Sequence, residues 1–148
     1  GKPMFHIVRA VLLSGACLVI SQSFAFGKLT TEEVKALFSG NTVETERRDG
    51  GVPGIDSPDR VENFATTFSL YFDTDGTLKK KTDGNPKVGK WRVTGDAKLC
   101  MEWKRKKEKC GHLHRQGDTY KRVIRRKNGF ILFEHTYMDV TPGNKYGL

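Results

Sequence analysis

The feature that most constrains the fold is a regular succession of short segments of β type. Each is rich in β-branched and aromatic residues, and Gly, Asp, Asn or Pro separates it from the next. No segment with the period of a helix lies between these β segments, so a parallel sheet with helical crossovers is excluded. The spacing predicts a mainly β fold, an antiparallel up-and-down meander that hides its edges by closing into a small barrel. The predicted strands cover residues 42–47, 64–72, 77–81, 88–94, 98–103, 109–115, 119–126 and 130–138.

One helical signal precedes these strands. Thr30 can cap a helix, and Glu33 stands where its carboxylate can reach back to the backbone N–H of the cap. Gly40 supplies the left-handed residue that commonly ends a helix. The sequence therefore predicts one short N-terminal helix that plugs or flanks the barrel and buries Val34, Leu37 and Phe38.

The first 25 residues have the pattern of a secretory signal peptide. Arg9 precedes an apolar stretch over residues 10–20, and small residues around Ala25 follow. The stretch is about half the ~20 residues that a membrane span needs. Cys17 lies within this stretch and is a candidate for lipid modification, but the residues before it match that pattern poorly. We expect a leader over 1–25, a single barrel domain over 26–148 with no transmembrane segment, and a periplasmic or secreted location.

Two cysteines remain once the leader is set aside. Cys100 and Cys110 bracket a hairpin whose tip is centred on Arg105, so a symmetric register places them opposite each other. Export favours a disulfide between them. The alternative is a copper or zinc site, because soft and borderline ligands cluster here. That candidate set is Cys100, Met101, Cys110, His112 and His114.

The last hairpin yields the candidate ligand-binding residues. A two-residue turn at Asn128-Gly129 sets a register in which alternate side chains share the inner face. A cation on that otherwise apolar face could orient an anionic ligand. The predicted pairs are Tyr120 with Tyr137, Arg122 with His135, Ile124 with Phe133, and Arg126 with Ile131, and the first two pairs are the candidate site.

Positive charge is concentrated in the central strands. The chain carries a formal net charge of +9, and residues 79–127 hold 18 Lys and Arg against 5 acidic residues. A field of this size attracts anions. Because the protein is expected to be exported, we predict an anionic lipid, a glycan or an acidic envelope protein as partner, and not nucleic acid. The predicted contact is the hairpin tip Lys104, Arg105, Lys106 and Lys107.

Catalytic patterns are weak. The serines and histidines after the leader show no nucleophile-elbow context, and no glycine-rich phosphate loop follows a strand. We therefore expect a binding protein that is not an enzyme, needs no cofactor and is stapled by one disulfide, with copper or zinc binding as the alternative function.

Several motifs together resemble a known family. They are the leader, the capped LTTEEVKALFSG segment, YFDTDGTL, GKWRV and LCMEW followed by KC. This set, covering most of residues 29–126, is similar to a family of small exported proteobacterial proteins whose domain has no assigned function. Gly89-Lys90-Trp91 also resembles the Gly-x-Trp of lipocalins. The resemblance implies a barrel architecture and carries no catalytic residue.

Overall fold

The computed structural model describes residues 26–148, so the predicted leader lies outside the described residues. Within this range no helix has the length and apolar character needed to cross a bilayer. The elements are β1 (Phe26–Lys28), α2 (Thr31–Phe38), β2 (Asn41–Asp49), β3 (Thr66–Phe72), β4 (Thr77–Lys80), β5 (Lys87–Val93), β6 (Lys98–Trp103), β7 (Lys109–Gln116), β8 (Thr119–Arg125) and β9 (Ile131–Pro142).

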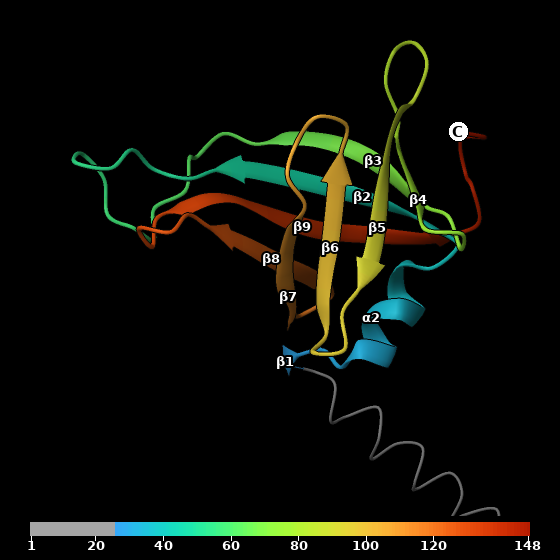
Figure 1. Cartoon of the computed structure of the whole chain (residues 1–148), viewed down its shortest axis with the longest axis horizontal. Coiled ribbons are helices and arrows are strands. Elements are labelled where there is room, and N and C mark those ends of the chain that lie inside the picture. Colours follow the sequence, from blue (N-terminus) through green and yellow to red (C-terminus); the bar gives the residue numbers. More distant parts are fainter. Residues whose placement is uncertain (1–25) are drawn as a thin grey trace, which may run out of the picture.

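The strands close into an antiparallel barrel, which confirms the predicted fold class. Sheet neighbours run in the order β1-β7-β6-β5-β4-β3-β2-β9-β8, and β8 returns to pair with β7. Eight strands, β2 to β9, form the closed wall (Figure 1). The short strand β1 was not predicted. It pairs with residues 114–116 of β7, beyond the part of β7 that pairs with β6. β1 therefore provides the neighbouring strand along the part of β7 that β6 is too short to reach.

The helix α2 begins and ends as its sequence dictates. The backbone N–H of Glu33 donates to Thr30 Oγ1 at 3.2 Å, and the N–H of Thr30 donates to Glu33 Oε1 at 2.9 Å. This reciprocal capping box satisfies two backbone donors at the start of the helix. Gly40 has a φ of +74° and turns the chain into β2. The predicted capped helix is confirmed.

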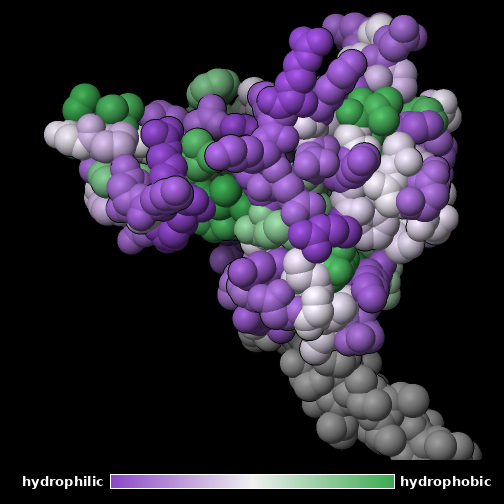
Figure 2. Space-filling view, viewed as in Figure 1, coloured by the Kyte–Doolittle hydropathy of each residue, from purple (hydrophilic) through white to green (hydrophobic). Residues whose placement is uncertain are grey.

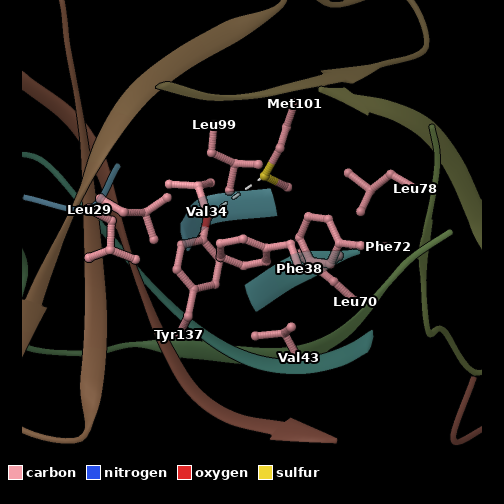
Figure 3. Packing of buried hydrophobic residues seen from close by; sticks show 11 residues of the cluster. Leu29, Val34, Phe38, Val43, Leu70, Phe72, Leu78, Leu99, Met101 and Tyr137 are labelled. Atoms are coloured by element: carbon pink, nitrogen blue, oxygen red, sulfur yellow. Dashed lines mark hydrogen bonds between the residues drawn. The ribbon is translucent and has the colours of Figure 1, made fainter. Parts of the chain in front are cut away.

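The helix α2 seals one end of the barrel with apolar side chains. Phe38 is fully buried, with its ring centroid 4.7 Å from that of Phe72 and 5.0 Å from that of Tyr137. Figure 3 shows the three rings packed together beside the helix, with Leu70 and Leu78 nearby. The hydrophobic core therefore fills the half of the barrel that lies against α2.

The hairpin between β8 and β9 differs from prediction in its turn. The backbone of Arg126 bonds to that of Phe130, and only Gly129, at φ +88°, has a positive φ in the loop. A two-residue type I′ turn requires positive φ at both positions, so the loop has three residues. A bulge between Ile124 and Arg125 then restores the predicted register. Three predicted pairs are confirmed, whereas Arg126 opposite Ile131 is wrong because Arg125 takes that place.

Candidate functional site

A cavity of about 450 Å³ occupies the half of the barrel away from α2. Its walls come from the strand ends farthest from the helix and from the hairpin between β6 and β7 (Figure 1). Six lining side chains are cationic, three are aromatic, and none of the lining residues is a carboxylate. The lining residues are Arg47, Thr66, Phe68, Lys80, Lys87, Met101, Trp103, Lys106, Lys107, Lys109, Leu132, Phe133 and His135.

Strand alternation carries the basic side chains into this cavity. Leu78 on β4 is buried in the core, and Lys80, two residues later, lies on the same face of the strand. Lys80 pairs across the sheet with Lys87 on β5, so both line the cavity. Figure 2 shows hydrophilic residues gathered over the hairpins at this end of the molecule. The barrel interior thus changes from apolar to basic along its length.

Gly89 on β5 makes room for the largest ring in the cavity wall. It pairs with Trp103 on β6, and a Cβ at Gly89 would lie 2.4 Å from the carbonyl oxygen of Glu102 and 2.7 Å from the Trp103 ring. Only glycine permits so close an approach. The Gly-x-Trp motif seen in the sequence therefore supports the indole of Trp103, whereas its own Trp91 packs against the core.

Three of the cations lie over aromatic rings of the same cavity, at distances that favour cation–π attraction. Burial, followed by the charges of Lys87, Arg47 and Lys106, lowers the pKa of the Lys80 ammonium. This crowding of like charges shows that positive potential builds up inside the barrel. Arg47 is also paired with Asp49, at 3.0 Å. The ring contacts are Arg47 over Phe133 at 4.2 Å, Lys80 over Phe68 at 4.3 Å and Lys87 over Trp103 at 5.1 Å.

Below the cavity lies a buried guanidinium, that of Arg122, which is 1% exposed. Its Nε donates to Tyr137 Oη at 3.0 Å, and its Nη1 donates to the carbonyl oxygens of Leu99 at 3.2 Å and Lys109 at 3.0 Å. Its Nη2 lies 3.1 Å from the sulfur of Met101. No carboxylate among the described residues forms an ion pair with it. Its donors are satisfied, but its charge has no opposite partner.

His135 separates Arg122 from the cavity and is 3% exposed. Its Nδ1 lies 3.4 Å from Nη2 of Arg122 and 3.1 Å from Oη of Tyr137. Because a guanidinium can only donate, we assign Nδ1 as the acceptor in its contact with Arg122, which assigns the ring proton to Nε2. That Nε2 is buried and has no hydrogen-bond partner among residues 26–148. Burial, and then the charges of Arg122, Arg47 and Lys80, hold the pKa of His135 well below its usual value.

Of the predicted ligand-binding residues, three come together and one does not. Arg122, His135 and Tyr137 form a single hydrogen-bonded cluster. Tyr120 lies apart, because its hydroxyl accepts a bond from Arg115 at 2.6 Å and it does not line the cavity. Tyr137 is fully buried below the cavity floor, so only His135 of the four lines the cavity.

The basic hairpin tip is also divided. All four residues are exposed, and Lys106 and Lys107 line the cavity whereas Lys104 and Arg105 do not. Sequence reasoning missed the inward-facing cations and rings of the other strands. Their signal was the alternation with buried neighbours, which places them on the inner face of each strand. The missed residues are Arg47, Phe68, Lys80, Lys87, Trp103 and Lys109.

The cysteines form the predicted disulfide. Cys100 and Cys110 are cross-strand partners with their Cα atoms 4.0 Å apart. The bridge leaves neither sulfur as a thiolate ligand. Met101 lines the inner cavity, whereas His112 and His114 alternate with the buried Leu113 and face outward. The structure does not bring the five predicted metal ligands together at one site.

Replacing both bridge cysteines, as C100S/C110S, should lower the free energy of unfolding by about 3 kcal/mol, because the unfolded chain loses a constraint. Urea denaturation followed by circular dichroism measures the difference. A reductant that opens the bridge should bring the natural protein down to the stability of the variant. Equal stability of the two proteins without reductant would contradict a structural role for the bridge.

Comparison with known proteins finds no matching family, no similar curated protein and no similar solved structure. The resemblances drawn from the sequence motifs therefore stay predictions. The functional argument depends on the geometry of the cavity.

Proposed function

We propose that this protein is an exported, non-enzymatic binding protein that holds an amphipathic anion in the basic cavity of its barrel. The observation that carries the proposal is the composition of the cavity wall. Six cations and three aromatic rings line one space, and none of the lining residues is a carboxylate.

The size and chemistry of this space suit such a ligand. Small-molecule sites commonly enclose about 300 to 1,000 Å³ and combine apolar walls with a few charged groups. Phe68, Trp103 and Phe133 offer surface to an apolar body, and the cations offer charge to an anionic group. Inside a barrel these charges are screened less than they would be on an open surface.

The exposed residues Lys104 and Arg105 extend the positive potential outward from the cavity. Long-range attraction of this kind accelerates the encounter with an anion. In a periplasmic or extracellular setting, the molecules that would supply such an anion are anionic lipids, glycans or acidic envelope components. We propose these as the source of the ligand.

A fluorescent anion tests the proposal. The natural protein should bind 8-anilinonaphthalene-1-sulfonate at least about tenfold more tightly than N-phenyl-1-naphthylamine, which has the same rings without the sulfonate. The K80Q/K87Q variant should lose at least about tenfold in affinity for the sulfonate, which is about 1.4 kcal/mol. Raising sodium chloride from about 0.05 to about 0.5 M should weaken the natural protein's binding.

The matched control is Lys90→Gln. Lys90 lies on the same strand as Lys87 and is exposed on the outer face of the barrel. Its replacement should leave affinity for the sulfonate within about twofold, because the cavity is unchanged. Equal binding by K80Q/K87Q and the natural protein, or equal affinity for the charged and uncharged probes, would contradict the proposal.

A further inference from the structure

We propose that the Nε2–H of His135 is the floor donor of the cavity and hydrogen-bonds an oxyanion of the ligand, a carboxylate, sulfonate or phosphate, with the charge of Arg122 behind it. The inference rests on the proposed function and deepens it. It names the atom that receives the charged group and the direction in which the ligand enters.

His135 stands where the core ends and the cavity begins. Along β9 the inner side chains are Phe133, His135 and Tyr137 in turn. Phe133 lines the cavity, whereas Tyr137 is fully buried against Phe38 of the sealing helix. A group that reaches the bottom of the cavity therefore meets His135.

The unpaired donor needs an acceptor. Buried polar groups in folded proteins are nearly always hydrogen-bonded, and an unpaired one costs free energy. Nε2 of His135 has no partner within the described residues, while the other ring nitrogen is occupied by Arg122 and Tyr137. Because Nε2 has almost no accessible surface, an oxygen at the bottom of the cavity would satisfy this donor after a small shift of the neighbouring side chains, while Nδ1 keeps its contacts with Arg122 and Tyr137.

The charge of Arg122 favours a negative acceptor. Its guanidinium faces Nδ1 of His135, so an anion at Nε2 would complete a chain from oxyanion through neutral imidazole to guanidinium. Hydrogen bonds arranged in such a chain polarise one another and strengthen. Arg47, the cross-strand partner of His135 on β2, adds a second positive charge beside the same position.

The surroundings also fix the ligand's orientation. The rings of Phe68 and Phe133 flank His135, with centroids 5.7 and 4.8 Å from the imidazole, and Trp103 lines the same cavity. An oxyanion on the floor would leave its apolar body against these rings. The ligand class is thus an oxyanion carried on an apolar body that enters charged group first.

The test compares two variants of the full chain. His135→Gln places an amide N–H close to the position of Nε2, whereas His135→Phe keeps a ring and has no donor. Both variants lose the nitrogen that faces Arg122, so their difference isolates the cavity-facing donor. For 1-naphthyl phosphate, H135Q should bind within about threefold of the natural protein, and H135F should bind at least about tenfold more weakly.

Three further ligands sharpen the result. Binding of 1-naphthol should be the same in H135Q and H135F, because it lacks the oxyanion. Affinity for 1-naphthoate should fall in H135F as it does for the phosphate ester. Inorganic phosphate should compete at the same site at a concentration at least about tenfold higher than 1-naphthyl phosphate, because it has no apolar body. Equal affinity for inorganic phosphate would identify the free ion as ligand and overturn the amphipathic part of the inference.

Nitrogen-15 NMR of labelled histidine supplies a readout that a merely structural role would not move. The signal of His135, assigned from its absence in H135Q, should show a protonated Nε2 that shifts on adding 1-naphthyl phosphate. The charged and titratable groups facing this ring are Arg122, Arg47, Lys80 and Tyr137. A proton on Nδ1, or an Nε2 signal that ignores the ligand, would overturn the inference.

The outcomes separate this inference from the proposed function. If K80Q/K87Q weakens anion binding while H135Q and H135F bind 1-naphthyl phosphate equally, the cavity binds anions but His135 does not receive them. If no anion binds the natural protein, the proposed function is wrong, and the inference that rests on it is wrong as well.

Discussion

Replacing Arg122 with alanine should lower the free energy of unfolding by about 3 to 5 kcal/mol, one of the largest effects expected of any single substitution in this chain. The side chain donates to two backbone carbonyls and to the hydroxyl of Tyr137, all in the barrel interior. Truncation leaves these acceptors without their donor and opens a void. Urea denaturation monitored by circular dichroism measures the loss.

Two companion variants make this prediction specific. Arg122→Met fills most of the volume, so it should be less destabilised than R122A but still clearly weaker than the natural protein. Arg126→Ala, at an exposed position just beyond β8, should change stability by no more than about 0.5 kcal/mol. If R122M were as stable as the natural protein, the donors of Arg122 would contribute nothing to stability.

Phe38→Ala should lower the free energy of unfolding by about 3 to 5 kcal/mol, because a fully buried ring is removed and a cavity remains. The ring lies between Phe72 and Tyr137 and anchors α2 in the end of the barrel. Chemical denaturation measures this change, and native-state hydrogen exchange of the helix amides shows whether the seal opens. In the Phe38→Ala variant we expect the amides of α2 to exchange faster than the amides of the core strands.

The control for Phe38 is an exposed position of the same helix. Lys35 is exposed, and Lys35→Ala should change stability by at most about 0.5 kcal/mol. A Phe38→Ala protein that unfolds like the control would mean that the helix does not seal the barrel through this ring.

The closed antiparallel barrel was predictable because short stretches of the sequence determine its turns. Hairpin symmetry about Arg105 placed Cys100 opposite Cys110, and the capping box of Thr30 fixed the start of α2. Three of the four predicted inner pairs of the last hairpin were also right, although the turn has three residues. The added loop residue and the bulge compensate each other, so the inner register was preserved despite the wrong turn.

The cavity was harder to predict because charged side chains line it, whereas charged residues of a strand are usually assigned to the solvent face. A lysine in an alternating strand is normally assigned to the solvent face, yet Lys80 and Lys87 point into the barrel. Lys109 is the cross-strand partner of Met101, and both line the cavity. Pairwise register would have placed these residues together, but only once the whole strand order was known. Strand β1 was missed because three residues carry no period.

The seal formed by α2 has a kinetic consequence. A barrel closed at one end has a single opening, so a molecule held inside must leave by the route through which it arrived. Such a barrel suits storage or sequestration of a ligand, or its transfer to an acceptor at the open end. It does not suit the passage of a ligand through the barrel from one side to the other. Residence time would then be governed by how readily the charged group releases its floor contact, since no second exit competes with that step.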